Sequence, residues 1–185
     1  MELRPRRVPV QVRGVIALLA VPLLFAALLP AWTAAEVRVV GVLLGATGVR
    51  VTGRGHQLLL AGDRGTMVLI VIGWCSSLGP VLASAAAAWL VPGSVRRRRR
   101  AAMIAGSLLV AGNVVRLAAI GWVGSSVDPS GVDRFHDGPA TAMSVLLVLS
   151  AAAIVLLWTG RSGQPTRRAM IASAAASPAR NAPST

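Results

Sequence analysis

The sequence predicts an all-α polytopic membrane protein with four transmembrane helices and an outer loop that contains an interfacial helix and a β-hairpin. Of its 185 residues, 55% are hydrophobic and only 14% are charged, a composition typical of polytopic membrane proteins. Four apolar runs reach the ~20 residues that a helix needs to cross a hydrocarbon core of ~30 Å. These predicted spans are about 14–32, 73–91, 101–123 and 138–158.

The first span is expected to stay in the protein as an anchor. The segment Leu23–Trp32 continues beyond the short apolar core of a signal peptide, and no convincing cleavage site follows it. Residues 1–160 then form a single integral-membrane domain. Residues 161–185, rich in Ala, Ser, Pro and Arg, are expected to be a disordered cytoplasmic tail.

The arginines predict the orientation in the membrane. With four spans and a cytoplasmic N-terminus, thirteen arginines lie inside and five outside, in agreement with the positive-inside rule. The net charge of +13 is thereby explained without nucleic-acid binding. The run Arg96–Arg100 is expected to be a stop-transfer anchor that contacts anionic lipid. The inner set is Arg4, Arg6, Arg7, Arg13, Arg96–Arg100, Arg161, Arg167, Arg168 and Arg180, and the outer set is Arg38, Arg50, Arg54, Arg64 and Arg134.

The first outer loop covers about residues 33–72. Its segment Val37–Val49 is apolar but includes Arg38 and is shorter than a span, which favours an interfacial helix or a re-entrant segment. Farther on, Leu58–Ala61 and Met67–Ile72 flank the turn-like tetrapeptide Gly62-Asp63-Arg64-Gly65. This pattern predicts a β-hairpin that leads directly to Cys75.

Three polar residues meet at the outer boundary under this topology. Cys75 lies within about one turn of the outer end of the second span. Arg116 is about 22 Å into the third span, so that its long side chain can reach the outer surface. His136 precedes the fourth span by two residues. The chain therefore has a candidate site with a thiol, a guanidinium and an imidazole on one side of the membrane.

The neighbours of these residues favour a thiol site. Cys75 is expected to begin a helix whose free amides and dipole stabilise a thiolate and an oxyanion, with Ser76 and Ser77 as caps. Asn113 and Arg116 share a helix face, and Gly112 lets another helix approach closely. We expect no cofactor and no metal, because no zinc-ligand spacing is present, and a single cysteine forms no internal disulfide.

Each residue also has a simpler interpretation. A lone cysteine is usually a small buried hydrophobic residue, and an arginine near the end of a span is often an interface anchor. Histidines in loops are commonly solvated, which is how we interpret His56.

The three motifs resemble those of the exosortase and archaeosortase family of membrane-embedded cysteine transpeptidases. In that family the cysteine lies in a Cys-Ser-Gly motif, the arginine in Asn-x-x-Arg, and a histidine or another arginine precedes a final span. The matching residues are Cys75, Arg116 and His136, and the resemblance covers about residues 37–158. Ser77 stands where the family usually has glycine, and the chain is shorter than many relatives.

The resemblance implies a function and a location. Cys75 would attack a sorting signal of a secreted protein and form a thioester, which an amine acceptor or water resolves. His136 would act as general base and acid, with Asp137 orienting it, and Arg116 would stabilise the thiolate, the oxyanion or a polar group of the substrate. Substrates would end in a short motif, a transmembrane helix and a basic cluster, and the enzyme would lie in the plasma membrane with its site outside. The alternative is a non-catalytic small subunit of a transport or secretion complex that uses Arg116 for helix packing.

Overall fold

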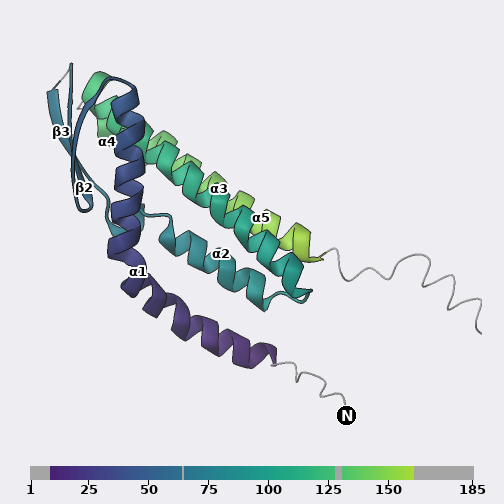
Figure 1. Ribbon diagram of the computed structural model, residues 1–185. Helices are drawn as coiled ribbons and strands as arrows, with labels where there is room; N and C mark the ends of the chain where they lie inside the picture. The colour runs from purple at the N-terminus through teal and green to yellow at the C-terminus, as the bar shows by residue number, and fades with distance from the viewer. Residues whose placement is uncertain (1–8, 64, 128–130, 161–185) are drawn as a thin grey trace, which may run out of the picture.

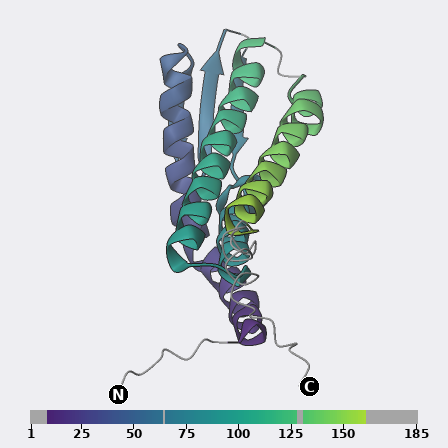
Figure 2. The same cartoon turned by 90° about the vertical axis from the view of Figure 1, so that its right-hand side faces the viewer.

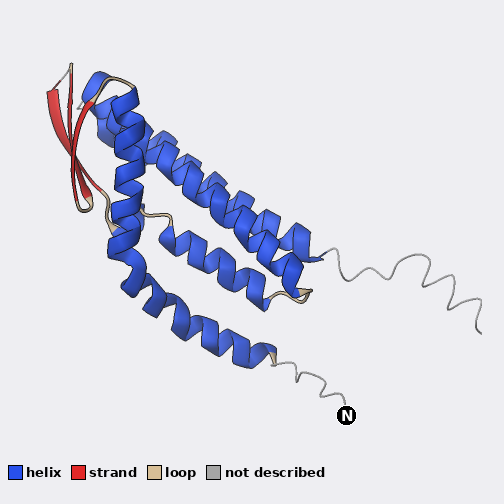
Figure 3. Cartoon of the chain, viewed as in Figure 1, coloured by secondary structure: helices blue, strands red, loops and turns tan. Residues whose placement is uncertain are grey.

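Helices make up most of the chain, and a small antiparallel sheet covers one end of them (Figure 1, Figure 3). The computed structural model describes residues 9–63, 65–127 and 131–160; the predicted tail, Arg64 and Asp128 lie outside these ranges. The elements are α1 (Val10–Ala46), β1 (Arg50–Arg54), β2 (Gln57–Gly62), β3 (Gly65–Ile70), the 3-10 turn η1 (Gly73–Cys75), α2 (Leu78–Leu90), α3 (Val95–Trp122), the π-helical turn η2 (Val123–Val127), α4 (Val132–Phe135), the π-helical turn η4 (His136–Ala140) and α5 (Thr141–Gly160).

Three of the described helices are long and apolar enough to cross a membrane, as expected for a helical membrane protein. They comprise Val10–Ala46, Val95–Ser126 and Val132–Thr159. The predicted second span, 73–91, instead divides into the turn η1 and the 13-residue helix α2. At ~1.5 Å per residue, α2 is about 20 Å long, which is shorter than a hydrocarbon core of ~30 Å. A fourth crossing through α2 stays a prediction.

The expected separate interfacial helix at 37–49 is wrong. Residues up to Ala46 continue α1, which has 37 residues and changes direction partway along its length (Figure 1). Pro22 and Pro30 lie inside the helix, and prolines bend helices because they lack an amide hydrogen. The segment packs against the rest of the protein because its buried residues lie on one face of the helix, where Val37, Val40 and Leu44 join the cluster beneath the sheet and Glu36 contacts the turn after Cys75. These buried residues are Thr33, Glu36, Val37, Val40 and Leu44.

The predicted hairpin is confirmed, and a third strand extends it. β2 pairs with β3 so that Gly62 lies opposite Gly65 and Leu58 opposite Leu69. β1 pairs with the other edge of β2 through a tight turn at Gly55, where φ is +62°. The sequence analysis missed β1 because four of its five residues are exposed, which leaves no alternation of apolar and polar side chains.

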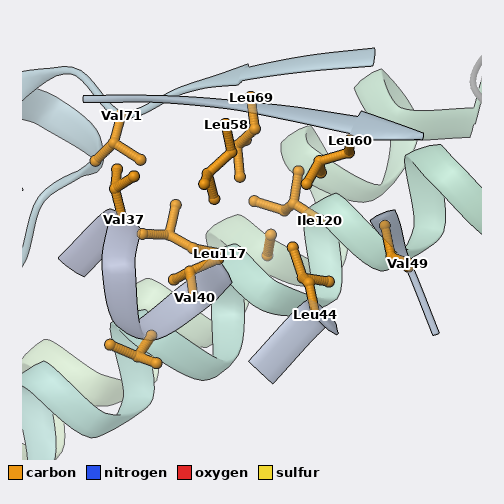
Figure 4. Close-up of a cluster of buried hydrophobic side chains, with 12 residues drawn as sticks. Val37, Val40, Leu44, Val49, Leu58, Leu60, Leu69, Val71, Leu117 and Ile120 are labelled. Carbon is orange, nitrogen blue, oxygen red and sulfur yellow. The ribbon is translucent and has the colours of Figure 1, made fainter. Parts of the chain in front are cut away.

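The main hydrophobic cluster lies between the sheet, the second half of α1 and the end of α3 (Figure 4). A side chain at Gly121 of α3 would come within 2.8 Å of Leu44 and 2.9 Å of Leu60, so that glycine allows helix and sheet to meet. The cluster holds the hairpin against the helices just before the chain reaches Cys75. Its labelled members in Figure 4 are Val37, Val40, Leu44, Val49, Leu58, Leu60, Leu69, Val71, Leu117 and Ile120.

Helices α3 and α5 lie side by side along most of their lengths (Figure 1, Figure 2). Leu147 of α5 packs directly against Gly112, which confirms the expected close approach at this glycine. The start of α1, the start of α3 and the end of α5 lie at one end of the bundle, and the sheet lies at the other (Figure 1). The run Arg96–Arg100 therefore lies far from the sheet.

Candidate active site

Cys75 is the last residue of η1 and is half-buried against the main hydrophobic cluster. The expectation that it begins a helix is wrong, because α2 starts three residues later, at Leu78. The amides from Cys75 to Leu78 are also already hydrogen-bonded, since the tight turn folds back on itself and on α1. Their acceptors, in order, are Ile72 O (2.8 Å), Gly73 O (3.4 Å), Glu36 Oε1 (3.0 Å) and Ser76 Oγ (3.2 Å).

The two serines after Cys75 have different roles. The Ser76 hydroxyl accepts a hydrogen bond from the amide of Leu78, the first residue of α2, whereas Ser77, the N-cap residue, makes no capping hydrogen bond with its side chain. The Ser77 hydroxyl instead donates to Glu36 Oε1 at 2.6 Å and accepts from Trp32 Nε1 at 3.2 Å. Ser77 therefore ties the turn after Cys75 to α1.

Asn113 and Arg116 lie on one face of α3 and are both buried. Asn113 Nδ2 donates to the carbonyl oxygen of Cys75 at 3.0 Å, and its Oδ1 accepts from Arg116 Nη1 at 3.4 Å. Arg116 Nε donates to the carbonyl oxygen of Ala140 at 3.1 Å. Arg116 is 7% exposed, and no described carboxylate forms a salt bridge with it. A buried, unpaired positive charge is costly, and it is suited to binding an anion or an oxyanion.

His136 begins the π-helical turn η4, and its neighbour Asp137 is its partner. His136 Nδ1 lies 3.1 Å from Asp137 Oδ1, and the two side chains are 42% and 82% exposed. When the proton is on Nδ1, it is donated to Asp137 and Nε2 is left as a base. This geometry agrees with the orienting role expected for Asp137.

Hydrogen bonds connect Cys75 to Arg116, and Arg116 to the turn that His136 begins. The path runs from Cys75 to Asn113, from Asn113 to Arg116, and from Arg116 to Ala140, the last residue of the turn that His136 begins. Among the described residues, no hydrogen bond joins His136 directly to Cys75 or Arg116. The fold thus brings η1, α3 and η4 to one place and leaves the imidazole at its exposed rim.

Sequence reasoning missed Glu36, to which it assigned no role in the site. Glu36 is 4% exposed, and its Oε1 accepts from Ser77 N, Ser77 Oγ and Asn113 Nδ2. A signal was present, since Glu36 stands four residues before Val40 and three after Thr33, on the buried face of an apolar helix.

An apolar groove of about 540 Å³ runs down the bundle from the site. It begins at Gly79, four residues after Cys75, and is bounded by α2 and α5 with α3 beneath. Small side chains keep it open on both walls. Its lining residues are Gly79, Pro80, Ala83, Ser84, Ala87, Val91, Leu109, Val148, Ala151, Ala152, Val155 and Leu156.

The chain matches no family model, no curated protein and no solved structure.

Proposed function

We propose that the protein is a membrane cysteine peptidase or transpeptidase, similar to exosortases and archaeosortases, that cleaves C-terminal sorting signals of secreted proteins. The observation that supports it most is the hydrogen-bond path from the Cys75 carbonyl through Asn113 and Arg116 to the turn of His136. A buried arginine with no described carboxylate partner, hydrogen-bonded through Asn113 to the turn that carries the sole cysteine, is suited to stabilise the oxyanion of a thiol acyl transfer.

The reaction begins with loss of the thiol proton to Nε2 of His136, directly or through a water. The sulfur then bonds to the scissile carbonyl carbon, the peptide C–N bond breaks, and His136 returns the proton to the leaving amine. An acceptor amine or water next attacks the thioester, and Cys75 regains its proton. Because the amides from Cys75 to Leu78 already have acceptors, Arg116 is the favoured donor to the oxyanion.

The proposed topology has four crossings, with both termini in the cytoplasm and the site on the outer side of the plasma membrane. Its support is that Arg96–Arg100 lies at the end of the bundle opposite the sheet, as the positive-inside rule favours. In this arrangement α2 lies within the bilayer and η1 lies at its outer boundary.

The proposed substrate presents a short motif at the membrane surface, followed by a transmembrane helix and a basic cluster. The groove beside α2 supports this choice, since it is apolar, begins next to the Cys75 turn and runs toward the opposite end of the bundle. A substrate helix in this groove would hold the motif near Cys75.

Replacement of Cys75 by serine tests the enzyme directly. In cells of the source organism, Cys75→Ser should leave the protein abundant and inserted but abolish cleavage, because serine is a far weaker nucleophile without a strong adjacent base. Mass spectrometry of membrane proteins should then detect substrates that retain their C-terminal helix. The wild-type protein, stopped in acid, should carry an adduct on Cys75 that hydroxylamine removes.

The competing function is a non-catalytic subunit of a transport or secretion complex. The half-buried position of Cys75 against the hydrophobic cluster is the observation in its favour, because it gives the thiol a packing role. In that case Cys75→Ser would leave every C-terminal helix processed as in the wild type, and no adduct would form.

A further inference from the structure

Glu36 joins three elements of the site through one oxygen atom. Its Oε1 accepts hydrogen bonds from the amide of Ser77 at 3.0 Å, the hydroxyl of Ser77 at 2.6 Å and Nδ2 of Asn113 at 3.0 Å. These donors belong to the turn after Cys75 and to α3, whereas Glu36 belongs to α1. One carboxyl oxygen therefore connects α1 with the turn that carries the thiol and with the helix that carries Arg116.

The same oxygen decides which way the Asn113 amide points. Nδ2 of Asn113 faces two acceptors, Glu36 Oε1 and the Cys75 carbonyl, each at 3.0 Å. Because both neighbours are acceptors, the amino group must lie on this side and Oδ1 must face Arg116. Glu36 thus fixes the acceptor that holds Arg116 Nη1, although it makes no salt bridge with that guanidinium.

The other oxygen of Glu36 has no described partner. Oε2 is fully buried and accepts no hydrogen bond among the described residues. A buried acceptor without a donor is costly, so the carboxyl is held in place by what Oε1 contacts. Glu36 therefore acts through one acceptor oxygen that reaches both Ser77 and Asn113, and it forms no salt bridge within the described part of the chain.

We propose that Glu36 is a positioning residue that places the Cys75 turn and Arg116 relative to each other through Ser77 and Asn113. The effect of Glu36 on catalysis rests on the proposed function, whereas its effect on the position of the Cys75 turn does not. Glu36 donates and removes no proton in the reaction.

Two conservative variants separate this role from that of an acid or a charge. Glu36→Gln keeps an oxygen acceptor at full reach and removes the charge. Glu36→Asp keeps the charge but shortens the side chain by one methylene, so that it no longer reaches Ser77 and Asn113 together. Asp133→Asn, an acid-to-amide change on the exposed surface of α4, is the matched control.

The first readout is the rate at which N-ethylmaleimide alkylates Cys75 in the purified full chain in lipid nanodiscs. Cys75 is the sole cysteine, so that the labelled thiol is known. Glu36→Asp should raise the rate about tenfold, because a half-buried thiol on a released turn becomes accessible, and Glu36→Gln should stay within about twofold of wild type. Helical content measured by circular dichroism should be the same in both variants as in the wild type, whereas a general loss of structure would lower it.

The second readout is processing in cells. Glu36→Asp should slow processing about 100-fold, which is the cost of displacing a reacting group by about 1 Å. Glu36→Gln should process substrate at the wild-type rate. Wild-type alkylation in Glu36→Asp, or alkylation of Glu36→Gln as fast as that of Glu36→Asp, would overturn the proposal. If Cys75→Ser processes substrate, the proposed enzyme is refuted, and the alkylation rates still decide the role of Glu36.

Discussion

Replacing Arg116 by lysine keeps the positive charge but replaces the planar guanidinium, with its several donors, by a single ammonium nitrogen. The guanidinium donates from two different corners, Nε to Ala140 O at 3.1 Å and Nη1 to Asn113 Oδ1 at 3.4 Å. The single nitrogen of lysine cannot occupy both corners, so that at least one of these hydrogen bonds is lost. A hydrogen bond to a charged group contributes ~1.5–3 kcal/mol, which corresponds to a rate loss of about 10- to 150-fold if it holds the transition state.

The assay compares processed and unprocessed substrate in cells that express Arg116→Lys at wild-type abundance. Hydrogen exchange should also become faster at the amides of η4, because the Ala140 carbonyl anchors this turn to α3. Arg134→Lys, at an exposed arginine of α4, is the matched control and should process normally. Normal processing by Arg116→Lys would refute the reasoning and return Arg116 to the role of a membrane anchor.

Two further predictions concern the topology and the groove. A phosphatase reporter fused after Gly131 should be active, and one fused after Gly93 inactive, because these loops lie outside and inside under the proposed arrangement; the reverse pattern would overturn the location of the site. Ala152→Phe places a ring on the wall of the groove and should reduce processing at least about tenfold, equivalent to ~1.4 kcal/mol of lost binding, whereas Ala153→Phe, which lies outside the lining, should not. Equal effects of the two alanine substitutions would show that the groove does not hold substrate.

The sequence predicted those helices and strands that are marked by a pattern within the segment itself. The long apolar runs predicted α3 and α5, and the glycine turn between two β-prone segments predicted the pairing of β2 with β3. β1 was missed because an exposed edge strand has no alternating pattern, and α1 was cut short because Arg38 interrupts an apolar run. Arg38 is exposed on the helix, so its charge did not end the element.

The candidate reactive residues of the site were predictable because their residue types are the ones that thiol chemistry uses. Cysteine and histidine are rare in this chain and an arginine inside an apolar run is costly, so these residues stand out, and the predicted topology places them at one membrane boundary. The role of Glu36 was not predictable, since it depends on partners 41 and 77 residues away that a sequence does not pair. The occupied amides around Cys75 were also hidden, because the exact start of α2 decides which amides remain free.

The separation of Glu36 from Asn113 also bears on how the protein is made. Asn113 is synthesised 77 residues after Glu36, a delay of roughly 4 to 15 s at ~5–20 residues per second. During that interval Glu36 can bind Ser77 but not Asn113, and Cys75 is made before Arg116. These partners are present only once α3, the second of the three long apolar helices, has been made. Under the proposed function, a chain that ends before α3 therefore carries the thiol without its oxyanion donor.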